Sequence, residues 1–265
     1  FLVDEGFQMN KNKIIKTNKK ICLFLNKEYK NLEEKFSFIN NNKIEIVLTV
    51  HQNYKQWNKK CPNSKFYKIP FAYDPNIFKR YDQEKTLDIG FSGNLFNTGI
   101  FTTISPNGVP YMGNNFNNVR ERIFDKLKEP QFNKYNKFLG GGVFLKGEEY
   151  GRKINSSKIW ICTPSAIDII GPRFYEILGS NTLLFCKNIE GVYTGLFEEN
   201  IHYVGFRDDL SDFEEKVVYY LENDIEREKI SSNGHKMAMQ KHTWNKRVDK
   251  IYDVLSKYAS QGVFK

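Results

Sequence analysis

The feature that most constrains the fold is an alternation of short apolar runs with a segment of helical spacing. Three runs near the start of the chain are strand-sized and rich in β-branched or aromatic residues: Ile21–Leu25, Ile44–Val50 and Phe66–Ile69. Between the first two runs, Tyr29, Leu32, Phe36 and Ile39 recur at intervals that place them on one helix face. Short strands that alternate with amphipathic helices predict a parallel sheet covered by helices.

The alternation stops at Pro70 and Pro75 and restarts after the polar stretch Lys79–Thr86, as is typical of a connection between domains. We therefore predict an α/β protein with an N-terminal domain over residues 1–80, a second domain over 81–243 and a C-terminal helix over 244–265. The first domain has only three clear strands, so we expect it to be short or truncated. The strands expected in the second domain are 87–91, 143–145, 159–162, 183–186 and 202–204, with helices near 119–127, 148–156, 173–179 and 210–221.

The net positive charge of the chain lies in the first domain. Residues 1–80 hold 16 Lys and Arg against 7 Asp and Glu, whereas the rest of the chain holds 24 of each. Such asymmetry indicates an anionic partner for the first domain, with a solvated lysine-rich surface as the alternative.

Length and composition exclude several classes of protein. A chain of 265 residues with 40% hydrophobic residues can build its own cores without disulfide or metal staples. No run of about 18 apolar residues exists, so we expect no transmembrane helix. The four cysteines are widely spaced and the chain opens with acidic residues where a signal peptide has basic ones. We therefore expect a cytoplasmic location, and peripheral contact with a membrane is a further option.

Familiar catalytic motifs are excluded in turn. Gly142 and Gly147 have the spacing of a phosphate-binding loop, but Glu148 follows where the motif needs Lys. No G-x-S-x-G elbow occurs, and the four histidines lack metal-ligand spacing. Asp208 and Asp209 are better interpreted as a helix start than as a metal–diphosphate pair. We therefore predict no metal and no cofactor.

One candidate binding site remains after these motifs are excluded, and it lies in residues 159–186. A buried strand runs into a loop of Pro, Ser and Gly, and a helix then begins near Gly171 and ends at Gly179. A helix N-terminus at the end of a strand offers free N–H groups and a partial positive charge. Arg173 in the first turn adds a cation suited to a diphosphate, and Glu176 one turn later offers a carboxylate suited to ribose hydroxyls.

These residues resemble the donor-site motif of GT-B glycosyltransferases, because Asp168 lies eight residues before Glu176 with Arg173 between them and Gly179 at the helix end. Within that group the motif resembles the glycosyltransferase group 1 or CgeB-like (spore maturation protein-like) family. Three further segments match in the same order: Lys68–Phe78 resembles the linker into the second domain, Leu87–Leu95 its first strand and glycine loop, and His242–Trp244 the C-terminal ending. The resemblance covers about residues 44–260.

The resemblance implies two Rossmann-like domains that face each other across a cleft, with a nucleotide sugar held mainly by the second. Glu176 would then bind the donor ribose and Arg173 would lie near the diphosphate. Ser92 and Gly93 would let the backbone approach the phosphates, and Arg120 is a further phosphate candidate. Asp168 stands where the family more often has Glu, and its implied role is contact with the sugar.

Each candidate also has an ordinary structural alternative. Glu176 could be a surface carboxylate, and Arg173 could form an exposed ion pair with it. Gly93 could simply make a tight turn, and Asp168 could cap the following helix. Tyr150 and Lys153 on the preceding helix are predicted to be surface residues.

The catalytic base is predicted from position alone. His51 directly follows the strand that ends at Val50, where it could take the proton of an acceptor hydroxyl, because the pKa of histidine lies near the working pH. A histidine hydrogen-bonded within a loop is the alternative. Asp74 is interpreted as a linker residue.

Together these residues predict a hexosyltransferase-type enzyme that moves sugar from a nucleotide-diphosphate sugar to a hydroxyl acceptor. The expected acceptor is a glycan, a lipid-linked molecule or a protein, anionic if the basic first domain binds it. Lys55, Lys59, Lys60, Lys65 and Lys68 leave open a nucleic-acid acceptor, which no binding motif supports, or an anionic membrane surface. The alternative outside enzymes is a non-catalytic GT-B-like binding or scaffold protein.

Overall fold

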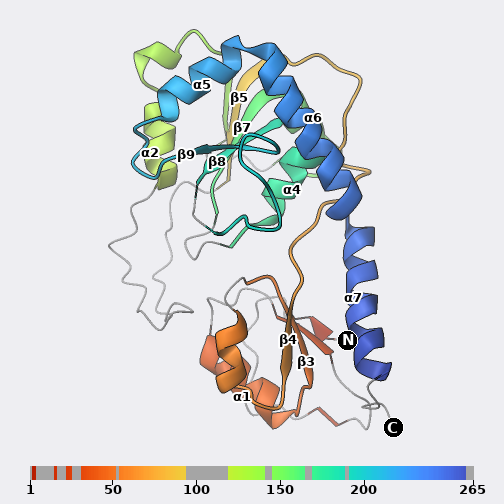
Figure 1. The fold of residues 1–265 in the computed structure, drawn as a ribbon. Coiled ribbons are helices and arrows are strands. Elements are labelled where there is room, and N and C mark those ends of the chain that lie inside the picture. The colour runs from red at the N-terminus through yellow and green to blue at the C-terminus, as the bar shows by residue number, and fades with distance from the viewer. Residues whose placement is uncertain are drawn as a thin grey trace. The chain divides into compact units, whose positions relative to one another are not determined.

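The computed structural model describes residues 2–3, 15–16, 22–25, 31–51, 54–93, 119–140, 145–164, 169–188 and 191–260. The described residues fall into two units (Figure 1). Unit 1 is drawn from Phe1–Pro70 and Arg247–Lys265, and unit 2 from Phe71–Thr98 and Asn117–Lys246. These boundaries differ from the sequence division at residues 80 and 243: the first falls after Pro70, and the second falls after Lys246, three residues into the C-terminal helix.

Unit 1 contains a parallel sheet of four strands in the order β1-β2-β3-β4. The three predicted apolar runs form β2 (Cys22–Leu25), β3 (Ile46–Thr49) and β4 (Lys65–Lys68). β1 (Leu2–Val3) was not expected from the sequence. The predicted helix is α1 (Leu32–Asn41), and a short 3₁₀ helix, η1 (Tyr54–Lys59), precedes β4.

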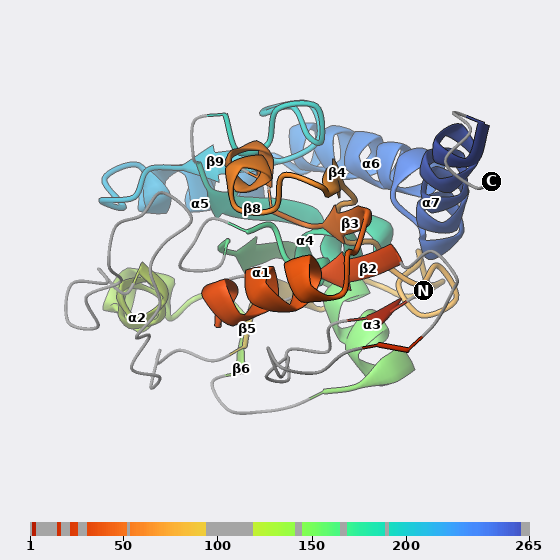
Figure 2. The same ribbon diagram turned by 90° about the horizontal axis from the view of Figure 1, so that it is seen from below.

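Helices cover both faces of the unit 1 sheet. Successive residues of a strand point to opposite sides, so neighbouring residues contact different helices. Leu23 and Val47 pack with Phe36 of α1. Their neighbours Cys22 and Ile46 pack instead with the C-terminal helix α7 (Trp244–Tyr258), through Tyr258 and its partly buried apolar residues. Figures 1 and 2 show α1 and α7 on different sides of these strands. The last helix of the chain thus completes the core of the first sheet.

Unit 2 contains a five-stranded sheet in the order β6-β5-β7-β8-β9, in which every neighbouring pair is parallel. The strands are β5 (Leu87–Ser92), β6 (Lys137–Gly140), β7 (Ser157–Cys162), β8 (Leu183–Lys187) and β9 (Val204–Phe206). In chain order this is 2-1-3-4-5, the arrangement of a doubly wound sheet that changes direction between its first and third strands.

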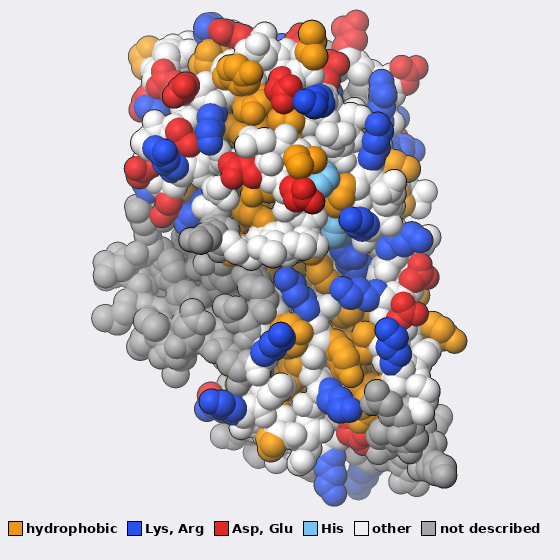
Figure 3. All heavy atoms as spheres, viewed as in Figure 1, with side chains coloured by type: hydrophobic (Ala, Val, Ile, Leu, Met, Phe, Trp, Pro, Cys, Tyr) orange, Lys and Arg blue, Asp and Glu red, His pale blue; other side chains and the backbone are white. Residues whose placement is uncertain are grey.

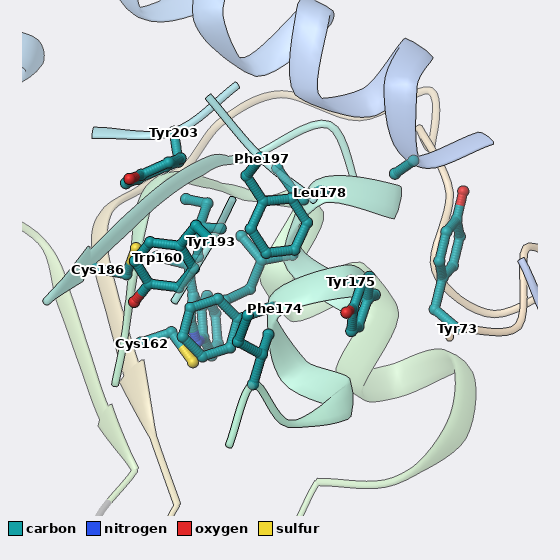
Figure 4. Packing of buried hydrophobic residues seen from close by; sticks show 14 of the residues in the cluster. Tyr73, Trp160, Cys162, Phe174, Tyr175, Leu178, Cys186, Tyr193, Phe197 and Tyr203 are labelled. Atoms are coloured by element: carbon teal, nitrogen blue, oxygen red, sulfur yellow. The ribbon is translucent and has the colours of Figure 1, made fainter. Parts of the chain in front are cut away.

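Two separate apolar cores flank this sheet. On one face α2 (Val119–Lys126), η2 (Pro130–Phe132) and α5 (Phe213–Glu222) cover residues such as Ile159 and Phe185. On the other face α3 (Gly147–Asn155), α4 (Pro172–Gly179) and the end of α6 (Asp224–Lys241) cover Trp160 and Cys186. Figure 4 shows how tightly the aromatic rings of this second core gather around α4.

Gly179, the last residue of α4, lies where the end of this helix meets Tyr73. A Cβ there would lie 2.3 Å from the ring of Tyr73, so only glycine allows the ring to pack against the helix end. Tyr73 in turn exchanges backbone hydrogen bonds with the start of α7 and the segment just before it, accepting from Trp244 N at 3.1 Å and donating to His242 O at 3.2 Å. The predicted helix stop is therefore also the place where the linker segment joins unit 2.

Three elements of unit 2 differ from the sequence expectation. The edge strand β6 lies at 137–140 rather than 143–145, of which residues 143 and 144 lie outside the described residues and residue 145 is not in a strand. β9 begins at Val204 instead of 202. The 18-residue helix α6 was not predicted, since its buried residues include Gly234 and Ser231 and give no apolar stripe.

The predicted fold class is confirmed: the protein is α/β, with two Rossmann-like parallel-sheet units. Each described helix is either too short or too polar to cross a lipid bilayer.

Candidate functional site

The candidate site lies at the carboxyl ends of β5 and β7 in unit 2. The strand order reverses between these two neighbouring strands. From β5 the chain goes outward to β6, and it then returns past β5 to form β7. In open parallel sheets, ligands bind outside the carboxyl ends of the strands at such a switch point. The residues that follow β5 and β7 are therefore placed where a ligand would bind.

Two arginines converge on the last carbonyl group of β5. Arg120, the second residue of α2, donates from Nη2 to Ser92 O at 2.6 Å and from Nη1 to Thr163 Oγ1 at 2.9 Å. Arg173, the second residue of α4, donates from Nη1 to the same Ser92 O at 3.2 Å. The first turns of two helices thereby bring two guanidinium groups to one turn of backbone, next to the end of β7.

Gly93 is the residue that makes this convergence possible. Its φ is +99°, a backbone conformation that residues other than glycine rarely adopt. A Cβ at this position would lie 2.5 Å from Arg173 Nη1 and 3.0 Å from Arg120 Nη2. The tight turn that the sequence offered as an ordinary alternative is therefore present, and both guanidinium groups pack directly against it.

Tyr150 of α3 fixes the position of Arg173. Its hydroxyl oxygen accepts a hydrogen bond from Arg173 Nε at 2.8 Å and lies 3.0 Å from Ser92 Oγ. The expectation that Tyr150 is a surface residue was therefore wrong, because its ring packs on Trp160 and its hydroxyl group belongs to the polar network. Lys153, also expected at the surface, is half-buried with its ammonium group 5.4 Å from the centroid of the Phe138 ring.

The N-terminus of α4 adds a partial positive charge at the same place. Its N-cap is Gly171, which has no side chain that could accept a hydrogen bond from the first turn, and Pro172 occupies the first helical position. The helix dipole and the first-turn N–H groups therefore point toward the same region as the two arginines. This combination suits an anionic group with several oxygen atoms.

Glu176 lies one turn after Arg173 on α4. Burial raises the pKa of Glu176 to about 7, and the nearby positive charge of Arg173 opposes that rise. Among the described side chains no ion pair joins Arg173 to Glu176, so the exposed ion pair considered from the sequence is not formed. A half-buried carboxylate in this position can accept hydrogen bonds from a hydroxylated ligand once it is ionised.

Burial lowers the pKa of Arg120, and the positive charge of Arg173 lowers it further. Two guanidinium groups that share one carbonyl repel each other, and an anion placed between them would remove that repulsion. The Arg120 guanidinium also lies 4.9 Å from the ring centroid of Phe91, the residue before Ser92 in β5.

The predicted base His51 lies in unit 1, at the end of β3. Its imidazole is 1% exposed and packs against Trp57, with the ring centroids 5.2 Å apart. Burial, together with the charge of Lys68, lowers the pKa of His51 to about 4. A group with such a pKa is a weak base near neutral pH, so these surroundings argue against the predicted role, which stays a prediction.

Asp168 lies outside the described residues, so its predicted roles stay predictions. Within the parts of the chain that the structure describes, no three or more His, Cys, Asp or Glu side chains gather where they could hold a metal ion.

Most of the described lysines of unit 1 are exposed. Figure 3 shows Lys and Arg side chains on the surface of one face of the molecule. Lys60 pairs with Glu33 at 3.1 Å, and the ammonium group of Lys65 lies 5.2 Å from the ring centroid of Tyr258. Lys68 is half-buried, and burial together with the charge of Lys250 lowers its pKa. These contacts are those of an ordinary charged surface, and an anionic partner for it stays a prediction.

The sequence profile of the glycosyl transferase-like family matches residues 120–253, about half of the chain. The chain belongs to this family. A search of curated proteins gave no significant sequence match.

Solved structures with a similar fold are glycosyltransferases of the GT-B type. Sucrose-phosphate synthase from Thermosynechococcus elongatus has a TM-score of 0.59 at 10% identity, over 93% of this chain and 69% of that one. HepE from Anabaena, in complex with UDP-glucose, has a TM-score of 0.61 at 14% identity, over 90% and 72%. A mutant of TarM from S. aureus, in complex with fondaparinux, alpha-GlcNAc-glycerol and UDP, has a TM-score of 0.56 at 13% identity, over 88% and 50%. These similarities establish the GT-B fold for this chain.

Four of the predicted residues thus come together: Ser92, Gly93, Arg120 and Arg173, with Glu176 beside them on α4. Sequence reasoning missed Thr163 and the role of Tyr150. Thr163 follows β7 directly, and a polar residue at that position in a switch-point strand was the signal that could have found it. Tyr150 gave no such signal, because only the packing of α3 against Trp160 places its hydroxyl group beside Arg173.

Proposed function

We propose that the protein transfers a sugar from a nucleotide-diphosphate sugar to a hydroxyl group of an acceptor. The observation that carries this proposal is the convergence of Arg120 and Arg173 on the carbonyl of Ser92, next to the N-terminus of α4. Membership of the glycosyl transferase-like family and the GT-B fold support it.

In the proposed reaction an oxygen atom of the acceptor forms a bond to the anomeric carbon of the sugar. The bond from that carbon to the diphosphate oxygen breaks, and the nucleoside diphosphate leaves with the electron pair. The acceptor proton passes to a base or to the departing phosphate. Charge develops on the diphosphate, and groups already aimed at that position stabilise it most effectively. Arg120, Arg173 and the α4 N-terminus would supply this stabilisation, and a metal ion would not be needed for it.

Glu176 is proposed to accept hydrogen bonds from the ribose hydroxyl groups of the donor. Its position one turn after Arg173 would place a ribose beside the diphosphate. The structure of HepE contains UDP-glucose, so uridine diphosphate and a hexose are the first nucleotide and sugar to test. Hexosyltransferase specificity, and the finer assignment to the CgeB-like subfamily, are part of this proposal.

The proposed acceptor binds through unit 1, whose excess of Lys and Arg favours an anionic molecule. The mutant of TarM is in complex with fondaparinux and alpha-GlcNAc-glycerol together with UDP, which supports a glycan as acceptor class. A nucleic acid or an anionic membrane surface would be recognised by the same charge. Binding to either would weaken steeply as salt is added, which a comparison with neutral glycan acceptors would detect.

Isothermal titration of the full chain with UDP-glucose, UDP and GDP-mannose tests the donor site. Binding of one of these in the micromolar range, followed by hydrolysis or transfer of its sugar in the presence of EDTA, is the expected result. Binding without any turnover would favour the scaffold alternative. Absence of binding by all three would remove the support for donor recognition at the arginine pair.

A further inference from the structure

Unit 2 has a cavity at the edge of the sheet opposite to the arginine pair. A cavity of about 560 Å³ opens where β5, β7 and β8 begin. The segment that leads into β5, the turns before β7 and β8, and the first half of α6 surround it, and Figure 1 shows that leading segment running beside α6. Cavities of this volume lie in the range that small-molecule ligands occupy.

The charged groups that face this cavity are mainly cations. The segment before β5 supplies Arg80 and Lys85, β7 supplies Lys158, and α6 supplies Arg227 and Lys229. The one carboxylate in the described lining is Glu228 of α6. The remaining lining side chains that face the cavity are largely uncharged polar groups, including Gln83, Asn155 and Ser232. The charged part of the lining is therefore mainly basic, with Glu228 as the exception.

Three of these cations already have carboxylate partners outside the lining. Lys158 pairs with Asp88 at 2.8 Å, Arg227 with Asp224 at 2.6 Å, and Lys229 with Glu226 at 3.7 Å. By contrast, no carboxylate among the described residues lies within ion-pair distance of Arg80 or Lys85. The positive charge available to a ligand is thus concentrated on the segment before β5.

Lys85 is held in place by neutral groups. Its ammonium group donates to Asn181 O at 2.9 Å and to Thr182 Oγ1 at 3.1 Å, both in the turn that precedes β8. An ammonium group has three N–H donors, so one donor is left over for a ligand in the cavity. Burial lowers the pKa of Lys85 to about 7, with further lowering by Arg227 and Arg80 and an opposing effect of Glu228. A bound anion would raise the pKa of Lys85 again, because it would place a negative charge beside the ammonium group.

We infer that this cavity binds a small phosphate-bearing molecule of about the size of a hexose phosphate, with its phosphate on Lys85 and Arg80. Several cations around one hollow suit a group with more than one negative charge, and polar amide and hydroxyl groups suit a hydroxylated body. This site is separate from the arginine pair, because it lies at the amino ends of β5 and β7, whereas Arg120 and Arg173 lie at their carboxyl ends. It does not depend on the proposed transfer reaction.

Acetylation of the full chain near pH 7, measured lysine by lysine with mass spectrometry, tests the inference directly. Only a neutral amine reacts, so Lys85 should be acetylated at least about fivefold faster than Lys236, an exposed lysine of α6 outside the lining. Millimolar inorganic phosphate or glucose phosphate should slow the reaction of Lys85 by about threefold or more and leave Lys236 unchanged. If neither anion protects Lys85, the inference is wrong.

Two variants separate this site from the arginine pair. Arg80 is exposed, so Arg80→Ala should fold normally and lose most of the phosphate protection of Lys85, whereas the matched control Lys236→Ala should keep it. UDP-glucose binding should be the same in both variants. Conversely, Arg173→Met should keep the phosphate protection. Protection that survives Arg80→Ala but disappears in Arg173→Met would place the anion at the other site and overturn the inference.

The dependence on pH supplies a further readout. Sulfate keeps its charge between about pH 6 and pH 9, so any change in its binding over this range reports on the protein. Its affinity should fall as Lys85 loses its proton, by about fivefold or more from pH 6 to pH 8.5. His235 of α6 also senses these charges: burial lowers its pKa, and the charges of Arg80 and Lys85 lower it further. Lys85→Met should therefore abolish the change with pH if Lys85 is its source. Sulfate binding that does not vary with pH would contradict the role given to Lys85.

Discussion

The two ends of the unit 2 sheet both gather cations, but they do so with different chemistry. At the carboxyl ends, two guanidinium groups are fixed by hydrogen bonds to Ser92, Thr163 and Tyr150. At the amino ends, an ammonium group is fixed by the turn before β8. Arginine keeps its charge at any physiological pH, whereas burial brings the pKa of Lys85 to about 7. The comparison indicates that the first site offers a constant charge and the second a charge that depends on pH.

The largest expected effect comes from removing one of the two guanidinium groups. Arg173→Met keeps the apolar stem and removes the hydrogen bonds to Ser92 and Tyr150, together with the charge that a diphosphate would meet. UDP-glucose affinity should fall by about 100-fold, since charged hydrogen bonds contribute about 1.5–3 kcal/mol. Titration calorimetry measures this, with Arg207→Met, an exposed arginine of the same unit, as the control. Equal affinity in the two variants would contradict the proposed donor site.

The next effect concerns the turn that both arginines pack against. Gly93→Ala introduces a methyl group 2.5 Å from Arg173 Nη1, at a φ of +99°. Gly191→Ala is its matched control, because φ there is +74° and no atom of the described residues lies within 4 Å of the added methyl group. Both variants should lose about 1 kcal/mol or more of stability from backbone strain. Only Gly93→Ala should also weaken UDP-glucose binding, by about tenfold, and a parallel loss in both variants would mean that strain alone is responsible.

A smaller effect follows from Glu176. The diphosphate of UDP-glucose is esterified at both ends and keeps its charge between about pH 6 and pH 8. Because burial raises the pKa of Glu176 to about 7, more of the carboxylate is ionised as pH rises through 7. The affinity for UDP-glucose should therefore increase by about fivefold from pH 6 to pH 8, and Glu176→Gln should show no such increase. An increase of the same size in the Gln variant would assign it to another group.

The same ionisation has a consequence for stability. The pKa of Glu176 in the folded chain lies above the unfolded value of 4.5, so the folded state holds this proton more tightly. The contribution of this tighter proton binding to the stability of the folded state is complete below about pH 4.5, and it is lost as the pH rises through about 7. Relative to Glu176→Gln, the wild-type chain should therefore become less stable over this interval, which urea unfolding at several pH values would reveal.

The last prediction concerns Lys85, whose effect on stability depends on pH with the opposite sign. Its folded pKa of about 7 lies below the unfolded value of 10.5, so its contribution to stability is present above about pH 10.5 and is lost as pH falls toward 7. Lys85→Met should remove this dependence. The wild-type chain should gain about 1–2 kcal/mol relative to Lys85→Met between pH 7 and pH 9, a shift of a few degrees in Tm. Lys236→Met provides the control, and a Lys85 variant with the wild-type pH profile would contradict the assignment.

Much of the fold could be predicted, because most core strands carry a strong local signal. Ile46–Thr49 and Leu183–Lys187 are almost wholly buried and read as continuous apolar runs, as strands covered on both faces do. The edge strand at 137–140 is mostly half-buried and lacks that signal. Helix α6 escaped prediction for a related reason: it packs through Gly234, where a Cβ would lie 2.7 Å from His202 O, and small residues leave no apolar stripe.

The sequence by itself determined the α/β class, the order of most elements and the candidates Arg173 and Glu176, because strand runs and helix boundaries are written in local residue patterns. Only the tertiary structure decided which side chains meet. Ser92, Arg120, Tyr150 and Arg173 are far apart in the chain and come together because parallel strands bring their carboxyl ends to one edge. In the same way Lys85 reaches the turn before β8 across 96 residues of sequence. Local patterns specify elements, whereas the charge that a site presents depends on burial and on neighbours that only the folded chain supplies.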